Sequence, residues 1–298
     1  MKKTLAVILC LIMALGVFAG CGDKNKGADS SSSADQGSDI KPVSEMTSLV
    51  VGFDAEYPPY GYKDENGEYV GLDLDLAEEV CKRNNWTLEK KAINWDGKDM
   101  ELNSGSVDCL WNGFTVTGRE DDYTWSVPYV NNSIVFVVMD DSDIKSKADL
   151  SGKIVVTQAA SSALTALTST EDNEENLALA KTFSDLQEVP DYNTAFMNLE
   201  SGAVDAIAVD IGVANYQLSS RQGMFRMLEE PLSKEQYAIG FKKGNEELRD
   251  VVQNTLFEMY KDGTFDKIVE KYSTGDYDTL KDMMCLGDYI PKDDADKE

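Results

Sequence analysis

Apolar residues occur along the chain in short blocks, and the spacing within each block predicts the element that it forms. The continuous apolar run Leu49–Phe53 ends at Asp54, which is typical of a buried strand. Two short aromatic stretches then flank Asn66-Gly67, a dipeptide that favours the tight turn of a hairpin. Asp73 predicts a helix cap, because apolar residues at helical spacing follow it. These residues are Leu76, Ala77, Val80 and Cys81.

The stretch 97–112 predicts a short helix that stops at Gly105, followed by a strand over 106–112. A pattern in this stretch, Met-x-Leu-x-Ser-Gly-x-Val-Asp, occurs at Met100–Asp108 and again, residue for residue, at Met197–Asp205. Each copy reads as a helix, a glycine stop and a strand. Alternating helices and strands predict an α/β fold with a largely parallel sheet, and the repeat predicts two lobes of like architecture.

The second unit begins near residue 140, and polar residues stand where its strands end. A strand over Ile154–Gln158 precedes Ser161-Ser162, which open a helix; hydroxyls in that place cap free N–H groups and favour an anion. Asp210 follows the repeated strand of this unit, and Arg119 lies in the loop after the equivalent strand of the first unit. Ligands of open α/β sheets bind beyond the carboxyl ends of the strands. The two charges are therefore candidates for opposite sides of one cleft.

Each of these polar residues also has a purely structural interpretation. In that interpretation the two serines cap a helix without any ligand, and Asp210 is a helix cap as well. Arg119 would then form a surface ion pair with the acidic residues 120–122. The rest of the chain adds little chemistry, since its apolar spacing predicts two amphipathic helices over 248–259 and 265–272.

The first residues predict export and a lipid anchor. Two lysines precede a short apolar run, which is typical of a secretion signal over 1–20 and too short to span a membrane. The sequence Phe18-Ala19-Gly20-Cys21 resembles the bacterial lipobox, with Phe18 in place of the usual leucine, and predicts acylation of Cys21. Two acyl chains give stable anchoring where a single chain anchors only marginally. The alternative is an ordinary cleaved signal in which Cys21 has no role.

The segment that follows the signal predicts a flexible tether over 21–46. It is rich in Ser, Gly, Asp and Lys and holds almost no apolar side chain, so it cannot bury enough surface to fold. The folded part then runs from about residue 47 to 298, and no later stretch is long and apolar enough to cross a bilayer.

Charge and residue usage exclude several classes of function. With 28 basic and 54 acidic side chains, the chain has a formal net charge of −26, which argues against nucleic-acid binding because that needs a basic surface. The chain has no histidine, which removes the commonest general base and most zinc sites, so we expect neither metal nor cofactor. The spacing of the remaining cysteines does not fit a metal site, so we expect them to be small core residues, with a functional disulfide as the alternative. They are Cys81, Cys109 and Cys285.

Four stretches of the chain, taken in order, carry a family resemblance. They are Val51–Tyr60, Gly71–Ala77, Gly113–Glu120 and the strand that ends at Asp210. Their order and spacing resemble the polar amino-acid family of extracellular solute-binding proteins of ABC importers, in its lipoprotein form, over about 48–275. The resemblance implies a two-lobed periplasmic-binding-protein-like fold of type II, in which two crossing segments form a hinge.

The resemblance also divides the chain between the lobes. It implies that lobe 1 comprises 47–138 and 239–298, and that lobe 2 comprises 139–238. The two crossings would then fall near Val137–Met139 and Ala238–Gly240.

A ligand site between the lobes follows from the same resemblance. Arg119 matches the residue that grips the α-carboxylate of an amino acid, and Asp210 matches the acceptor of its α-ammonium group. Ser161 or Ser162 would meet the carboxylate, since the loop before them is one residue longer than in relatives. The other implied contacts are Tyr57 over the ligand, Asp54 beside a polar or cationic side chain, Asn112, Gly113 and Thr115 through backbone and hydroxyl groups, and Trp95 as a pocket wall.

The resemblance implies a receptor rather than an enzyme. We expect the chain to bind a free, polar or cationic amino acid outside the cytoplasm and to deliver it to a membrane permease, anchored to the outer face of the cell membrane through Cys21. Glutamine, arginine, lysine and cystine are the candidate ligands. The alternatives are a dehydratase-like enzyme of the same fold and a ligand-sensing module that reports to a membrane partner.

Overall fold

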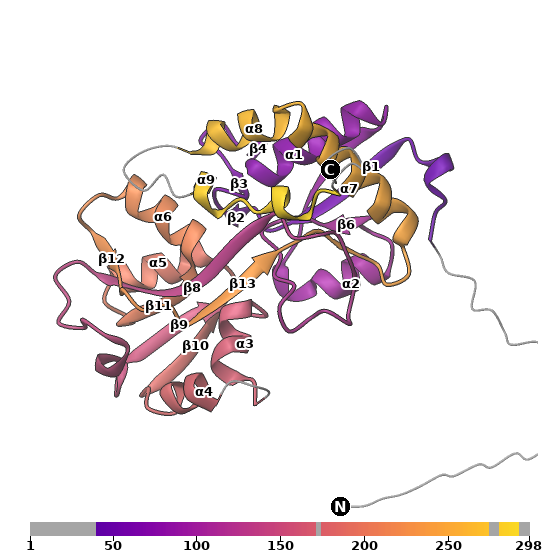
Figure 1. Ribbon diagram of the computed structural model, residues 1–298. Helices are drawn as coiled ribbons and strands as arrows, with labels where there is room; N and C mark the ends of the chain where they lie inside the picture. Colours follow the sequence, from indigo (N-terminus) through magenta and orange to yellow (C-terminus); the bar gives the residue numbers. More distant parts are fainter. Residues whose placement is uncertain (1–39, 171–173, 274–279, 292–298) are drawn as a thin grey trace, which may run out of the picture. The chain divides into compact units, whose positions relative to one another are not determined.

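The computed structural model describes residues 40–170, 174–273 and 280–291. They form two α/β lobes, each built on a sheet of its own (Figure 1). The predicted signal sequence, Cys21 and the tether up to residue 39 lie outside the described residues. The α/β class and the two-lobed architecture are confirmed.

Lobe 1 is built on a five-stranded sheet. Its strands lie in the order β5 (Thr87–Ala92), β1 (Ser48–Phe53), β6 (Cys109–Leu110), β14 (Gly240–Phe241) and β7 (Thr124–Trp125). The first three are parallel, and β14 is antiparallel to both of its neighbours. The predicted hairpin forms a small separate sheet of β2 (Glu56–Tyr57), β3 (Gly61–Lys63) and β4 (Tyr69–Val70). The helices of this lobe are α1 (Leu72–Arg83), α2 (Lys98–Asn103), α7 (Glu246–Lys261), α8 (Thr264–Tyr272) and α9 (Leu280–Met283), with short 3-10 turns at Val43–Glu45, Trp95–Gly97 and Leu286–Tyr289.

Lobe 2 is built on a six-stranded sheet. Its main path is β10 (Asp185–Val189), β9 (Ile154–Gln158), β11 (Ala206–Asp210), β8 (Val130–Met139) and β12 (Phe225–Met227), and β13 (Ser233–Tyr237) also pairs with β8. The helices of this lobe are α3 (Ser162–Thr168), α4 (Glu174–Ala180), α5 (Tyr192–Glu200) and α6 (Ile211–Ser220), with a 3-10 turn at Lys147–Leu150.

The two sheets begin with the same arrangement. In lobe 1 the order β5-β1-β6 is parallel throughout, and in lobe 2 the order β10-β9-β11 is parallel as well. The two copies of the sequence repeat occupy equivalent places in this arrangement, α2 with β6 and α5 with β11. The repeat therefore marks one structural unit used twice, as the sequence predicted.

The first crossing between the lobes comes earlier in the chain than the family resemblance implied. The apolar run Val137–Met139 was expected to cross, but β8 pairs along its length with strands of lobe 2, antiparallel to β11 and β13. The chain therefore leaves the sheet of lobe 1 after Trp125 and enters that of lobe 2 at Val130. The chain changes sheet a second time between Tyr237 and Gly240.

Asp73 does not cap α1, contrary to the sequence prediction. Gly71 is the N-cap, with a φ of 144°, and a Cβ there would lie 2.1 Å from the carbonyl oxygen of Tyr60, so only glycine fits. Asp73 lies inside the first turn, fully buried, and its Oδ2 accepts hydrogen bonds from the backbone N–H of Gly113 and the hydroxyl of Tyr129, both at 2.7 Å. Burial raises the pKa of this carboxyl to about 7. Asp73 thus holds the loop after β6 through its hydrogen bond to Gly113.

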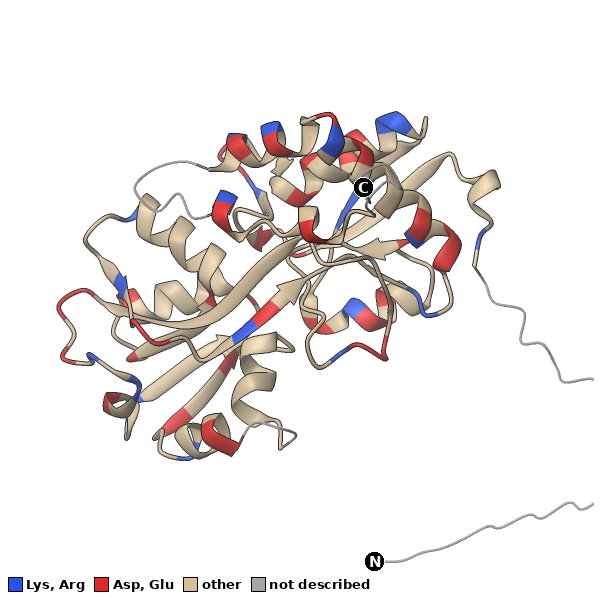
Figure 2. Cartoon of the chain, viewed as in Figure 1, with Lys and Arg blue, Asp and Glu red and all other residues tan. Residues whose placement is uncertain are grey.

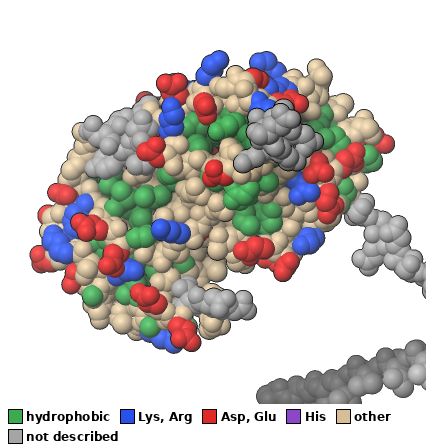
Figure 3. Space-filling model, viewed as in Figure 1, with side chains coloured by type: hydrophobic (Ala, Val, Ile, Leu, Met, Phe, Trp, Pro, Cys, Tyr) green, Lys and Arg blue, Asp and Glu red, His purple; other side chains and the backbone are tan. Residues whose placement is uncertain are grey.

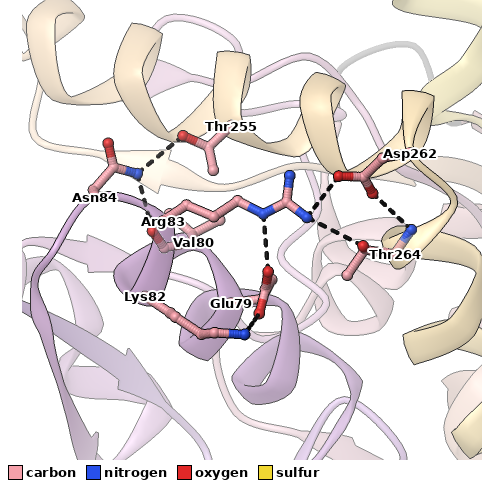
Figure 4. Close-up of polar contacts among 8 residues, drawn as sticks. All are labelled: Glu79, Val80, Lys82, Arg83, Asn84, Thr255, Asp262 and Thr264. Carbon is pink, nitrogen blue, oxygen red and sulfur yellow. Dashed lines mark hydrogen bonds and ion pairs between the residues drawn. The ribbon is translucent and has the colours of Figure 1, made fainter.

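The C-terminal helices return to lobe 1 and are joined to α1 by polar contacts (Figure 4). Arg83 donates from Nε to Glu79 at 2.9 Å, and from Nη2 to Asp262 at 2.8 Å and Thr264 at 3.1 Å. Asn84 donates to the hydroxyl of Thr255 at 3.0 Å. These contacts tie the end of α1 to α7 and to the start of α8, so lobe 1 contains chain segments from both sides of lobe 2.

Two smaller predictions have clear outcomes. The flexible tether was expected to reach residue 46, but Val43–Glu45 forms a 3-10 turn and Met46 is buried in the core, so ordered structure begins before residue 47. Cys81, Cys109 and Cys285 are buried free thiols, which confirms that they are core residues rather than a disulfide framework.

Charge is distributed over the surface rather than concentrated in one place. Acidic residues occur on helices and loops of both lobes (Figure 2), and on the face drawn in Figure 3 acidic and basic side chains alternate with apolar ones. None of the described helices is long and apolar enough to cross a membrane. Nor do the described residues contain a group of three or more metal-ligating side chains placed to hold an ion.

Candidate functional site

Residues of both lobes line one narrow cavity of about 20 Å³. Lobe 1 contributes the loops after β1 and β6, and lobe 2 contributes the start of α3 and the end of β11. Nine of the ten predicted ligand residues line it: Tyr57, Trp95, Asn112, Gly113, Thr115, Arg119, Ser161, Ser162 and Asp210. Phe114 and Gln158 complete the wall, and neither was predicted.

Arg119 is not a surface ion-pair residue. Its guanidinium donates to the carbonyl oxygen of Thr115 from Nη1 and to that of Ala160 from Nη2, both at 3.3 Å, and its Cζ lies 5.5 Å from the centre of the Phe114 ring. Within the described part of the chain it forms no ion pair with the acidic residues 120–122. Ala160 belongs to lobe 2, so Arg119 already reaches across the cleft. Two carbonyls engage only part of its five N–H donors.

Asp210 stands at the N-cap position of α6, but its side chain does not act as a cap. The carboxylate is buried and accepts hydrogen bonds from Asn132 at 2.7 Å, Tyr237 at 2.5 Å and Tyr192 at 3.4 Å. Burial raises the pKa of Asp210, and the hydrogen bond from Tyr237 opposes that rise. The helix-cap interpretation is therefore wrong, and the structure directs this charge toward the cavity wall.

Glu235 is a buried acid beside Asp210 that the sequence analysis did not single out. Its Oε1 accepts hydrogen bonds from Thr115 at 2.7 Å, Asn132 at 2.8 Å and Ser162 at 3.1 Å. The amide nitrogen of Asn132 thus donates to both acids. Burial, with a smaller contribution from the charge of Asp210, raises the pKa of Glu235 from its usual 4.5 to about 8. With its pKa raised above 7, Glu235 is largely protonated at neutral pH, and the two acids titrate as a pair.

Glu235 could have been found from the strand pattern. Along β13 burial alternates, so that Glu235 and Tyr237 share the buried face. A charged residue in phase with a buried tyrosine is unusual, because ionisable side chains are rarely buried without a partner.

The two serines at the start of α3 have different contacts. The Oγ of Ser161 accepts the backbone N–H of Leu164 at 3.1 Å, so this serine is the N-cap. Ser162 instead donates its hydroxyl to Glu235. Both line the cavity, and Ser162 is the one whose hydroxyl is not needed by the helix.

Tightly packed backbone positions shape the lobe 1 side of the cavity. Gly113 has a φ of 57°, and a Cβ there would lie 2.9 Å from the ring of Tyr57 and 3.0 Å from that of Tyr237. Asn112 accepts the backbone N–H of Asp54 at 2.8 Å, while its buried Nδ2 has no hydrogen-bond partner among the described residues. This nitrogen packs against Gly61, where a Cβ would lie 2.5 Å from it.

Asp54 is the one predicted residue outside this cavity. It lines a more open hollow beside it, together with Glu56, Glu101 and Asp191, and Trp95 lines both spaces. Gln158 of lobe 2 donates to Asp54 at 2.5 Å and separates the two spaces. Burial raises the pKa of Asp54 to about 6.

Lys98 is a second cation of the cleft that the sequence did not indicate. It is 5% exposed, its Nζ lies 5.3 Å from the ring centre of Trp95, and it donates to the carbonyl oxygen of Ala160 at 3.4 Å. Arg119 donates to the same oxygen. Burial, with a smaller contribution from the neighbouring charge of Arg119, lowers the pKa of Lys98 to about 8.

Comparison with known proteins identifies the family of the chain. Residues 49–275 match the bacterial extracellular solute-binding proteins, family 3. The L-cystine-binding protein TcyA of Bacillus subtilis (strain 168) is 32% identical over 273 residues, which is 90% of this chain and 96% of the relative. Another similar protein is a substrate-binding protein of an ABC uptake transporter from Streptococcus pneumoniae, solved with bound histidine. It is 29% identical with a TM-score of 0.71, and the match covers 78% of this chain and 94% of that chain.

A third similar protein is an ancestral arginine-binding protein solved with arginine. It is 35% identical with a TM-score of 0.69, and the match covers 76% of this chain and 99% of that protein. The family match extends over most of the chain and includes both lobes. This chain therefore belongs to the bacterial extracellular solute-binding proteins, family 3.

Proposed function

We propose that the chain binds a free amino acid in the cavity between its lobes and delivers it to the permease of an ABC importer. One observation carries this proposal: Arg119 of lobe 1 and Asp210 of lobe 2 border the same cavity with opposite charge. The relatives named above, which bind cystine, histidine or arginine, support the same class of ligand.

The charges match the needs of a zwitterion. A free amino acid leaves water only if each of its charged ends gains an opposite charge and full hydrogen bonding. The guanidinium of Arg119 offers a planar fork that suits a carboxylate. Asp210 offers an acceptor for the ammonium group. Because the two charges come from different lobes, the ligand itself would hold the cleft closed.

Glu235 extends the ammonium site. It is linked to Asp210 through Asn132, and it touches Thr115 of lobe 1 and Ser162 of lobe 2. We propose that the ammonium group of the ligand takes the place of the proton on Glu235, so that both acids are ionised when the ligand is bound.

The charges also narrow the choice of amino acid. Past the zwitterion site, Asp54 lines the adjoining hollow and favours a cationic group at the far end of the ligand. L-Cystine, with a second ammonium group, and arginine and lysine, with cationic side chains, all meet this condition. Lys98 contacts the same carbonyl oxygen as Arg119 and so adds positive charge beside the guanidinium.

The cell-surface setting follows from the N-terminal residues. The family is extracellular, and we propose that acylated Cys21 holds the chain to the outer face of the membrane, with the segment after it as a tether to the permease. A chain held in this way meets its permease by diffusion along the membrane.

A thermal-shift screen of the chain without its signal sequence tests the proposal. The twenty amino acids and L-cystine are added one at a time, and a ligand at about 100 times its dissociation constant adds about 2.7 kcal/mol of stability. We expect L-cystine or a cationic amino acid to give the largest shift. If no α-amino acid raises the unfolding midpoint, the proposal is wrong.

The enzyme alternative has one observation in its favour. Asp210 and Glu235 are adjacent acids with raised pKa values, which is the kind of pair that acid–base catalysis uses. We propose binding without turnover, and we expect each amino acid to be recovered unchanged after incubation. Conversion of an amino acid, or of a prephenate-like or arogenate-like acid, would favour the dehydratase-like enzyme.

A further inference from the structure

Two methionines on the surface stand out because they occupy the same position in the two copies of the repeat. Met100 on α2 is 70% exposed and Met197 on α5 is 66% exposed. They are the most exposed large apolar side chains among the described residues, ahead of Tyr260 at 38% and Tyr289 at 36%. Single exposed apolar residues are ordinary on protein surfaces, but a matched pair at repeat-related positions needs a reason.

The other residues that the two copies share have matched structural roles. The shared leucines and valines are buried in both copies, and the shared glycines have left-handed φ angles of 74° and 73°. The shared aspartates each accept a backbone N–H from the parallel strand beside the one that they precede, Asp108 from Val50 of β1 at 2.7 Å and Asp205 from Ile154 of β9 at 2.8 Å. The shared serines each donate to the carbonyl three residues earlier, at 3.1 and 3.0 Å.

Folding therefore explains every shared residue except the methionine. A methionine on the outer face of a short helix leaves apolar surface in water, and a polar residue of equal helix propensity, such as Gln, would serve the fold as well. The matched exposure of Met100 and Met197 points to a contact made outside this chain.

Both methionines belong to helices that border one opening of the cleft. Glu101 of α2 and Asp191, the N-cap of α5, line the same open hollow. One partner that covers this hollow can therefore meet both helices. Because the helices hold equivalent places in two like lobes, the partner that fits them best presents two like pockets related by an approximate two-fold axis.

We propose that Met100 and Met197 are paired apolar anchors that dock the chain onto the two membrane subunits of its permease. This inference rests on the proposed function, and it adds the surface and the symmetry of the contact. Asp99 and Glu101 flank Met100, and Glu200 lies close to Met197 in sequence. These acids already have partners within the chain, Lys91 for Glu101, Tyr123 for Asp99 and Arg221 for Glu200, so the partner surface is defined by its two apolar pockets. Methionine suits such pockets because its unbranched side chain adapts to their shape.

Replacement of both anchors tests the inference in living cells. The full chain and its variants Met100→Gln, Met197→Gln and the double variant replace the natural gene, and immunoblots show equal amounts. Uptake of radiolabelled L-cystine, L-arginine, L-glutamine and L-histidine is measured one at a time. Tyr289→Ser serves as the matched control, because it removes an exposed large side chain outside the repeat. Thermal shifts with the same four amino acids measure binding separately.

We expect each single variant to lower uptake by about tenfold, since a buried methionine side chain contributes strongly to a contact. The double variant is expected to fall to the level of cells without the gene, while its thermal shifts and those of the control stay unchanged. Wild-type uptake by the double variant overturns the inference. So does a wild-type dimer that the double variant converts to monomer, because a second copy would then be the partner. If the wild-type chain shows neither thermal shift nor uptake with any amino acid, the proposed function fails first.

Discussion

Glu235→Gln is the substitution that examines the buried acid pair most closely. Glutamine has the shape of glutamic acid, so its Oε1 still accepts hydrogen bonds from Thr115, Asn132 and Ser162. The substitution removes the titratable proton of the carboxyl group. In the empty protein Glu235 has a pKa of about 8, and we infer that ligand binding expels its proton.

The pH dependence of binding follows from that pKa. If only ionised Glu235 accepts the ligand, affinity falls about tenfold for each pH unit below 8 and levels off above it, so binding at pH 6 is about 100-fold weaker than at pH 9. Asp54 and Lys98 also titrate in this range, with pKa values of about 6 and about 8. The ratio of wild-type to variant affinity at each pH cancels their contributions.

Isothermal titration calorimetry between pH 6 and 9 gives the required affinities. The wild type should gain affinity with pH and release a proton on binding, which measurements in buffers of different ionisation enthalpy detect. The Gln variant should lose the part of that dependence that Glu235 causes. A wild-type affinity that changes in parallel with that of the variant from pH 6 to 8 would refute the assigned role of Glu235.

The same substitution has a second effect, on the stability of the empty protein. The pKa of Glu235 is about 8 when folded and near its usual 4.5 when unfolded, so the folded chain binds the proton more strongly. Its contribution to stability is fully present below pH 4.5 and is lost as the pH rises through 8. We therefore expect the unfolding midpoint of the wild type to fall more steeply than that of the variant between pH 5 and 8.

Three further substitutions probe other parts of the site. Arg119→Ala should weaken amino-acid binding by roughly 100-fold or more, because an unpaired buried carboxylate costs about 3–5 kcal/mol; Arg119→Lys should recover only part of this, and calorimetry that shows wild-type affinity for either variant contradicts the site. Lys98→Met should weaken the binding of L-cystine and of L-glutamine alike by about tenfold, as expected for about 1.4 kcal/mol, because it removes a positive charge beside the guanidinium of Arg119; wild-type affinity for both would show that Lys98 has no part in binding. Gly113→Ala should lower the unfolding midpoint by several degrees, through about 1–3 kcal/mol of overpacking against Tyr57. Its control is Gly105→Ala, a left-handed position where a Cβ meets nothing within 4 Å, and equal losses for the two would rule out the packing explanation.

The sequence predicted the architecture well because its strongest signals are local. The repeat can be read directly from the sequence, and it places Gly113 and Asp210 at equivalent ends of two parallel strands. The carboxyl ends of such strands face the ligand side of a sheet. The sequence alone therefore assigns the opposite charges of Arg119 and Asp210 to one cleft. The structure brings both to the same cavity.

The missed residues depend on contacts between distant segments. Glu235 touches Thr115, which is 120 positions away, and Lys98 touches Ala160, which is 62 positions away. Asp73 resembled a helix cap because a carboxylate near a helix start usually is one, yet it serves the loop after β6 instead. The first crossing was placed too late for a similar reason, since only strand pairing shows that β8 belongs wholly to lobe 2.

The central claim is that a charge from each lobe holds one end of a free amino acid. A crystal structure grown with the amino acid that gives the largest thermal shift tests it directly. We predict that the α-carboxylate lies within hydrogen-bond distance of the guanidinium of Arg119, and that the α-ammonium group lies within the same distance of the carboxylate of Asp210. Density for the amino acid at any other place, or in the cavity with neither contact, would contradict the claim.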